Sequence, residues 1–110
     1  MNLVVMSGKV FGDVFKEYED HGKSSSVAKF TLENQTYSPK ANKIYRTNIP
    51  VIATGALADY CYNEMYNGQE VIVTGRLLNK MFRVPDTGKM LNRLYMVCNT
   101  ISPLIQNEYT

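Results

Sequence analysis

Two segments of the sequence combine positive charge with aromatic rings, a chemistry that suits binding of single-stranded nucleic acid. Residues 37–48 and 75–95 hold eight of the twelve basic residues and one of the ten acidic residues. Cations neutralise phosphates, and flat rings stack on unpaired bases. The net charge of +2 hides this concentration because the other acidic residues lie elsewhere in the chain. We therefore predict a nucleic-acid-binding site of eleven residues: Tyr37, Lys40, Lys43, Tyr45, Arg46, Arg76, Lys80, Phe82, Arg83, Lys89 and Arg93.

The sequence offers no residue set that suits catalysis or metal binding. His21 is the only histidine, and its Gly- and Ser-rich surroundings are typical of a loop. Cys61 and Cys98 lack the spacing of a zinc site, and their apolar neighbours indicate buried thiols. No glycine-rich phosphate loop precedes a helix. We predict that the protein is not an enzyme and needs no cofactor or metal.

The hydrophobic pattern predicts five strands and one helix. Strands are expected over residues 2–11 with an extension over 14–18, and over 27–33, 43–54, 70–83 and 90–101. Loops are expected at 19–26 and 34–42, and a turn at 85–88. Gly8 inside the first strand predicts a bulge or bend, and Pro50 inside the third predicts an edge position or a bulge. Helical spacing predicts a helix within 56–66, stopped by Asn67-Gly68.

This order of elements predicts an all-β fold. Three strands, a short helix and two further strands are the layout of the OB-fold, a five-stranded Greek-key barrel with one short helix between strands 3 and 4. Ala28, Phe30 and Leu32 share one face of the second strand and are expected in the core. OB-folds bind oligonucleotides across strands 2 and 3, between two loops. The two basic segments coincide with the loop before strand 3 and the start of that strand, and with the hairpin of strands 4 and 5.

The length of 110 residues indicates one domain. We expect the barrel to occupy residues 1–105, followed by a short C-terminal end at 106–110. No apolar stretch is long enough to span a membrane, and the start of the sequence lacks the pattern of a secretory signal. We therefore expect a cytoplasmic location.

Four stretches resemble, in order and spacing, the bacterial single-stranded DNA-binding protein family. They are NLVVMSGKV at 2–10, VAKFTL at 27–32, IPVIATGALADY at 49–60 and GQEVIVTGRL at 68–77. The last stretch is fairly specific, and the resemblance extends from Asn2 to about Pro103. It implies an OB-fold that usually assembles as a homotetramer and wraps single-stranded DNA without strong sequence preference.

The resemblance also implies roles for individual residues. Two aromatic residues that the family stacks on bases fall at Tyr37 and Phe82. Two others fall near Asn48 and at Thr54, which are polar here, and Tyr45 is a candidate substitute for the first of these. The sequence has no Trp, which the family often uses for stacking. Since each stacked base contributes about 1–3 kcal/mol, we expect weaker or differently routed binding than in a typical member.

Family members usually end in a Gly- and Gln-rich tail that recruits replication proteins, whereas residues 105–110 lack that composition. We expect either a tail-less relative, as from a phage, plasmid or mobile element, or a chain from which the tail was removed. Three functions stay open. One is single-stranded DNA binding in replication, recombination or repair. The second is a primosome-like adaptor that mainly contacts other replication proteins, and the third is RNA binding.

The apolar run at residues 3–6 exceeds what one barrel face needs. An apolar edge strand left unpaired invites association. We therefore predict a homodimer or homotetramer assembled through the first strand and the sheet surface away from the binding groove.

Overall fold

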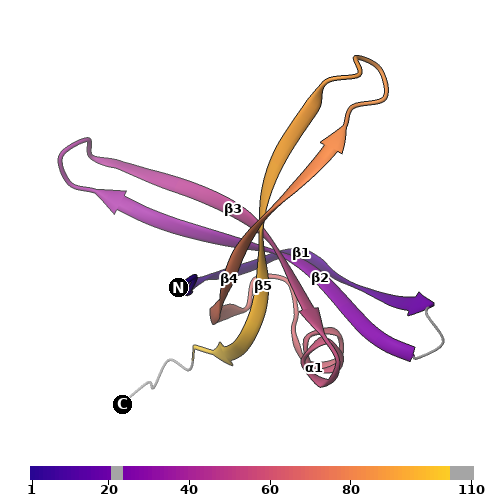
Figure 1. Ribbon diagram of the computed structural model, residues 1–110. Helices are drawn as coiled ribbons and strands as arrows, with labels where there is room; N and C mark the ends of the chain where they lie inside the picture. Colours follow the sequence, from indigo (N-terminus) through magenta and orange to yellow (C-terminus); the bar gives the residue numbers. More distant parts are fainter. Residues whose placement is uncertain (21–23, 105–110) are drawn as a thin grey trace, which may run out of the picture.

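A computed structural model describes residues 1–20 and 24–104 of the protein. Within these residues the chain forms a closed barrel with strand order β1-β2-β3-β5-β4 (Figure 1). The predicted five-stranded OB-fold barrel, with one short helix between strands 3 and 4, is confirmed. The elements are β1 (Val4–Asp20), β2 (Ser24–Ser38), β3 (Lys43–Thr54), α1 (Ala56–Glu64), β4 (Glu70–Arg83) and β5 (Met90–Pro103).

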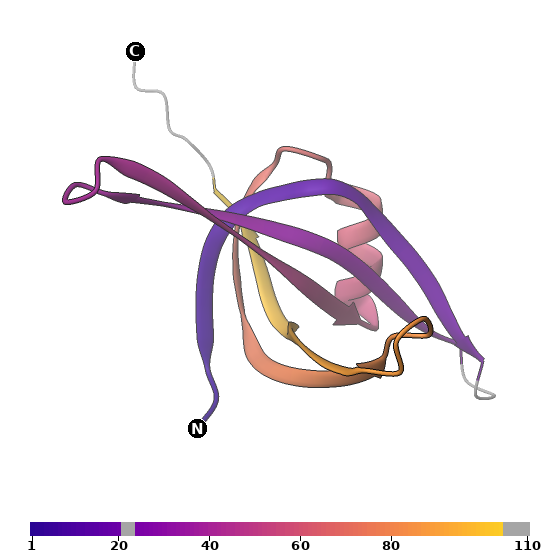
Figure 2. The same cartoon turned by 90° about the horizontal axis from the view of Figure 1, so that it is seen from above.

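Two hairpins extend well beyond the barrel. We call residues 33–48 the β2–β3 arm and residues 78–95 the β4–β5 arm. Antiparallel pairing continues to Ser38↔Lys43 in the first arm and to Arg83↔Met90 in the second. Figure 1 shows both arms projecting away from α1, and Figure 2 shows that they point in different directions. The principal extents of 52 × 35 × 30 Å reflect these projections.

The core lies inside the barrel and is built from the inward face of every strand. Ala28, Phe30 and Leu32 are buried, as the alternation of the second strand predicts. They cluster with side chains from β1, β3, β4 and β5. Ala58 and Cys61 of α1 belong to the same cluster, so the helix closes the end of the barrel opposite the arms (Figure 1).

Gly8 and Gly75 allow two close approaches of strands. A Cβ atom at Gly8 would overlap the carbonyl group of Glu33, and one at Gly75 would overlap the carbonyl group of Val97. At Gly8, β1 passes from pairing with β4 to pairing with β2, which begins at Lys9↔Glu33. The glycine that predicted a bulge or bend in the first strand therefore lies where β1 changes its pairing partner, and only a residue without a side chain fits there.

The bulge of β1 lies further along the strand than Gly8. The β1–β2 register shifts between Phe11 and Phe15, and Gly12 within this segment has a φ of 83°. Pairing resumes after the shift, so the predicted extension over 14–18 is part of the same strand. Pro50 occupies an edge position, as predicted, because the pairing of β3 with β5 involves Val51 and Ile52, which follow it.

The hairpins are longer than the sequence predicts. β1 reaches Asp20, and β2 begins at Ser24 and continues to Ser38. The prediction of loops at 19–26 and 34–42 is therefore wrong for most of their length. Residues 43–48 are exposed, and an arm with solvent on both faces lacks the apolar alternation that marks a strand. The centre of the first expected loop, at 21–23, and the expected C-terminal end, at 106–110, lie outside the described residues.

Candidate nucleic-acid interface

A cleft of about 380 Å³ lies where the base of the β4–β5 arm faces the outer surface of β2 and β3. The arm contributes two cations and two rings, and the sheet contributes a third cation. These five side chains are Lys80, Phe82, Arg93, Tyr95 and Lys29. Cations beside exposed rings are the features by which proteins hold unpaired nucleotides. The cleft therefore has the composition of a single-strand binding site.

Strand alternation explains why the arm presents these residues together. Lys80 lies opposite Arg93, Phe82 lies opposite Leu91, and Tyr95 lies opposite Leu78. Directly opposed residues of an antiparallel pair point to the same face. Lys80, Phe82, Arg93 and Tyr95 therefore lie on one face of the arm, and all four line the cleft.

Lys80 and Arg93 form an unfavourable pair in the isolated protein. Like charges directly opposite each other on neighbouring strands are destabilising. Among the residues that the structure describes, neither cation has a carboxylate partner. Arg76 is exposed on the same face of β4 and adds to the positive charge. The phosphates of a nucleic acid would relieve this repulsion.

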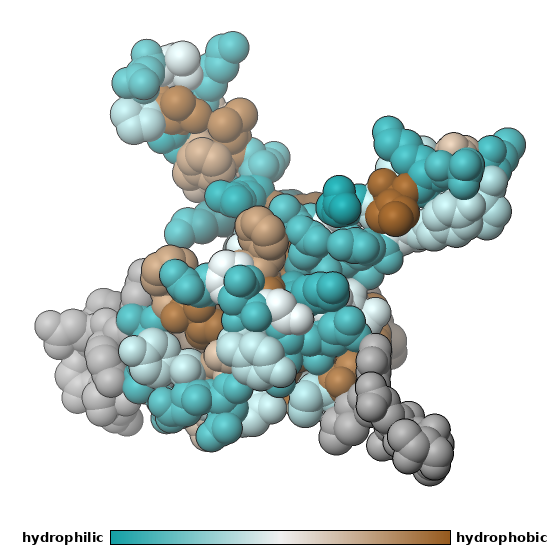
Figure 3. Space-filling model, turned by 180° about the vertical axis from the view of Figure 1, so that it is seen from behind, coloured by the Kyte–Doolittle hydropathy of each residue, from teal (hydrophilic) through white to brown (hydrophobic). Residues whose placement is uncertain are grey.

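Two predicted residues of the β4–β5 arm are not brought to the cleft. Arg83 has the opposite parity and shares its face with Met81, Met90 and Leu94, which are exposed. Lys89 lies at the tip, where its carbonyl group accepts a hydrogen bond from the Val84 backbone N–H. Figure 3 shows apolar side chains gathered on both arms among hydrophilic ones.

The β2–β3 arm continues the outward face of the sheet through Tyr37 and Arg46. Tyr37 lies opposite Ile44 and Arg46 lies opposite Gln35, so both lie on the face of the sheet that carries Pro50, which lines the cleft. The Tyr37 ring is 57% exposed, and its hydroxyl donates a hydrogen bond of 2.8 Å to Asn42 Oδ1. This bond holds the ring at the end of the arm with its faces available.

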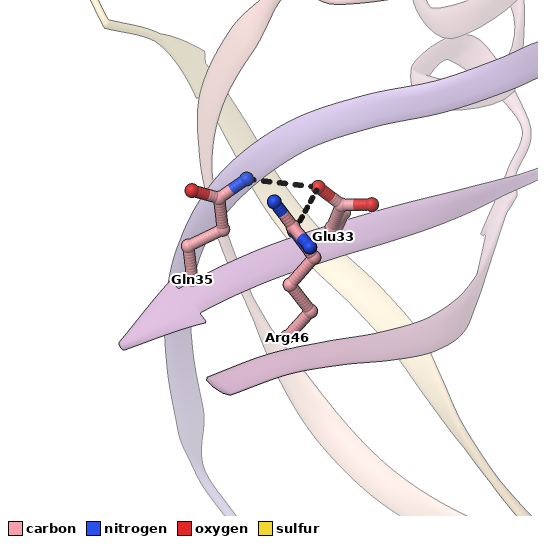
Figure 4. Close-up of polar contacts among 3 residues, drawn as sticks. All are labelled: Glu33, Gln35 and Arg46. Carbon is pink, nitrogen blue, oxygen red and sulfur yellow. Dashed lines mark hydrogen bonds and ion pairs between the residues drawn. The ribbon is translucent and has the colours of Figure 1, made fainter. Parts of the chain in front are cut away.

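A polar cluster restrains Arg46 (Figure 4). Arg46 Nε lies 4.0 Å from Glu33 Oε1, and Gln35 Nε2 donates a hydrogen bond of 3.0 Å to the same oxygen. The Arg46 side chain is exposed and the Glu33 side chain is partly buried, and an ion pair as long as this, with one partner in solvent, contributes little stability. The pair places the exposed guanidinium beside a carboxylate, with which the phosphate of a bound nucleic acid would compete.

Three predicted residues of the β2–β3 arm lie away from this face. Lys43 and Tyr45 have the opposite parity, and Lys43 Nζ lies 5.4 Å from the centroid of the Tyr45 ring. Lys40 lies in the turn between the strands. Tyr45 was a candidate substitute for the stacking residue expected near Asn48. Asn48 lies on the face of β3 that carries the cleft, whereas Tyr45 lies on the other face, so the two positions are not equivalent.

Sequence reasoning missed Lys29 and left Tyr95 out of the site. Both line the cleft. The signal for Lys29 was available, because it alternates with the buried residues of β2 and so faces outward. Its position across the cleft from the β4–β5 arm depends on the curvature of the barrel, which the sequence pattern does not contain.

The two cysteines have a structural role. Both are buried free thiols, as predicted. Burial raises the pKa of Cys61 to about 11, and burial together with the neighbouring Cys61 raises the pKa of Cys98 to about 12. Both thiols are therefore protonated and unreactive near neutral pH.

The described residues contain no cluster of three side chains suited to a metal ion. Over the same part of the chain, no helix has the length and apolar character needed to cross a membrane.

The closed five-stranded barrel and the cationic, ring-bearing cleft on its β2–β3 face define an oligonucleotide-binding OB-fold protein. The sequence model of the single-strand binding protein family matches residues 1–104, and the chain belongs to this family. The resemblance noted in the sequence is thereby confirmed. No curated protein matches the chain. Membership of the family implies binding of single-stranded DNA, and proteins of this family are not enzymes.

Proposed function

We propose that this protein binds single-stranded DNA without strong sequence preference and acts in DNA replication, recombination or repair. The observation that supports this most strongly is the opposed pair Lys80 and Arg93, two cations that line the cleft together with Phe82 and Tyr95. Phosphate contacts and stacking carry little sequence information, since every base has a face that stacks. Binding therefore depends on unpaired bases and not on their order.

Competition between oligonucleotides tests this proposal. A labelled oligo-dT is bound to the full chain and displaced by unlabelled single strands of equal length and different base composition. We expect displacement by all of them within a few-fold of one another. A single sequence that competes far better than the others would contradict binding without sequence preference.

A second proposal concerns assembly into a homodimer or homotetramer through the first half of β1. Leu3 and Val5 are 62% and 63% exposed. Val4 to Lys9 pair with β4 on one side, whereas the pairing with β2 begins only at Lys9, so the described residues leave most of the other edge without a strand partner. An apolar strand edge of this kind suits pairing with a second copy.

The alternative function, a primosome-like adaptor that mainly contacts replication proteins, has support from one surface. Met81, Met90 and Leu94 are 60%, 49% and 53% exposed on the face of the β4–β5 arm that points away from the cleft. Such side chains suit a protein partner better than a phosphate backbone. The double substitution Met81→Lys/Leu94→Lys separates the two functions, because it should leave DNA affinity unchanged or higher under the first and abolish partner binding under the second.

A further inference from the structure

Phe11 and Phe15 of β1 expose two aromatic rings on the barrel wall beside the cleft. Their side chains are 57% and 62% exposed, although aromatic rings of this size normally contribute to cores and interfaces. Phe11 lies opposite Thr31 of β2, and Phe15 lies opposite Lys29. Both rings therefore project from the outward face that also carries two side chains lining the cleft.

The bulge of β1 brings these two rings together. They are four positions apart in the sequence, but their partners Thr31 and Lys29 are only two positions apart. The extra residues are absorbed around Gly12, whose φ of 83° suits a bulge. In a regular strand, position 13 would also face outward and would separate Phe15 from Phe11. The bulge thus places the two rings at adjacent outward positions next to the cleft.

Lys29 and Thr31 join the cleft to a second hollow. This hollow has a volume of about 360 Å³ and is bordered by Phe11, Asp13 and Phe15. The same two β2 residues line the cleft on their other side. A single-stranded nucleic acid that leaves the cleft across β2 would therefore pass over the two rings.

We propose that Phe11 and Phe15 form a second base-stacking platform, which extends the binding path from the cleft across β2 onto β1. This inference rests on the proposed binding of single-stranded DNA. On its β1 side the hollow favours bases over phosphates, because the two rings offer stacking faces and the Asp13 carboxylate repels phosphate. The Lys29 cation lies on its β2 side, where the hollow meets the cleft. The backbone of the strand would follow the cations of the cleft.

Tryptophan fluorescence gives a local readout of this platform, since the sequence contains no Trp. Phe15→Trp in the full chain introduces a single reporter, and Tyr66→Trp introduces a matched one at an exposed aromatic position next to α1. On addition of an oligo-dT of about 20 nucleotides, longer than the range for one OB-fold, we expect quenching of the reporter at position 15 and none at position 66. Equal behaviour of the two reporters would overturn the platform.

Affinity for strands of different length gives the second readout. Phe11→Ala/Phe15→Ala should weaken binding of a strand of about 20 nucleotides roughly 5- to 150-fold per lost stacked base and leave binding of a strand of about 6 nucleotides unchanged. Phe11→Leu/Phe15→Leu keeps an apolar surface without rings and should lose as much. Thermal melting of both variants should match that of the parent because the rings are exposed.

The outcomes separate this inference from the proposed function. If the parent binds oligo-dT and Phe82→Ala weakens it, but the Ala pair binds long strands as the parent does, the second platform is wrong and the cleft stands. If the Leu pair binds long strands as the parent does, or if the Ala pair changes the sedimentation of the protein without DNA, the rings form a protein contact and the inference falls. If the parent binds no single strand, the proposed function itself fails.

Discussion

Lys80 and Arg93 lie directly opposite each other on β4 and β5, and both side chains line the cleft. Two like charges in this relationship weaken the hairpin that carries them. Lys80→Gln and Arg93→Gln should therefore leave thermal stability unchanged or slightly raised, within about 0.5 kcal/mol. Each should weaken binding of single-stranded DNA and reduce the slope of log K against log salt by about 0.7.

Arg83→Gln provides the matched control for these substitutions. Arg83 belongs to the same arm and carries the same charge, but its parity places it on the other face. Titrations of oligo-dT at several salt concentrations should show a smaller change of slope for this variant. A larger change than that of Arg93→Gln would mean that the strand follows the opposite face of the arm.

Phe82 and Tyr37 are the rings at which loss of stacking should be visible. Phe82→Ala and Tyr37→Ala should each weaken binding by about 1–3 kcal/mol, because each removes a surface on which a base stacks. Tyr45→Ala should cost less than Tyr37→Ala, since Tyr45 faces the other side of the β2–β3 arm. Fluorescence anisotropy of labelled oligo-dT measures all three, with Tyr66→Ala as a control for loss of an exposed ring.

Only part of the candidate cleft could be predicted from the sequence. Charge and ring clustering identified Lys80, Phe82 and Arg93, which the structure brings into one cleft. Residue type alone could not separate Arg46 from Tyr45, because the face of each is set by register in an arm without a buried side. Lys29 was missed because its partners across the cleft are distant in sequence.

The fold was more predictable than the site. Ala28, Phe30 and Leu32 alternate with polar residues because one face of β2 is buried, and this difference is written in the sequence. The helix within 56–66 was equally clear from its spacing. The two arms and the bulge at Gly12 could not be predicted from the sequence. An exposed hairpin has no periodic apolar residues, and a bulge changes the register of a strand without changing its composition.

Val5 tests the proposed assembly through β1. Its side chain is 63% exposed, so Val5→Lys should not disturb the core. Placed at a β1–β1 contact, however, the charge would be desolvated and would oppose association. Sedimentation velocity at micromolar concentration should show an oligomer for the parent and a shift toward monomer near 12.5 kDa for the variant. A parent that sediments as a monomer would contradict the assembly.

The buried thiols predict a loss of stability in alkali. Burial raises the pKa of Cys61 to about 11 and the pKa of Cys98 to about 12, above the ordinary value of 9.0. The folded state therefore holds these protons more tightly than the unfolded chain, so their contribution is full below pH 9.0 and is lost as the pH rises through about 11 for Cys61 and about 12 for Cys98. Urea unfolding from about pH 8 to about pH 10.5 should show a flatter decline for Cys61→Ala/Cys98→Ala. Parallel curves would rule out this contribution.

The central claim is that this protein recognises unpaired strands through phosphates and bases together. A titration of the full chain with poly-dT, poly-U and duplex DNA of equal length, at two salt concentrations, tests it most directly. We expect poly-dT to bind more tightly than duplex, because only unpaired bases can stack on Phe82 and Tyr37, and we expect affinity to fall as salt rises. The titration with poly-U reports whether DNA is preferred over RNA. Equal affinity for duplex, or binding that salt does not change, would contradict the claim.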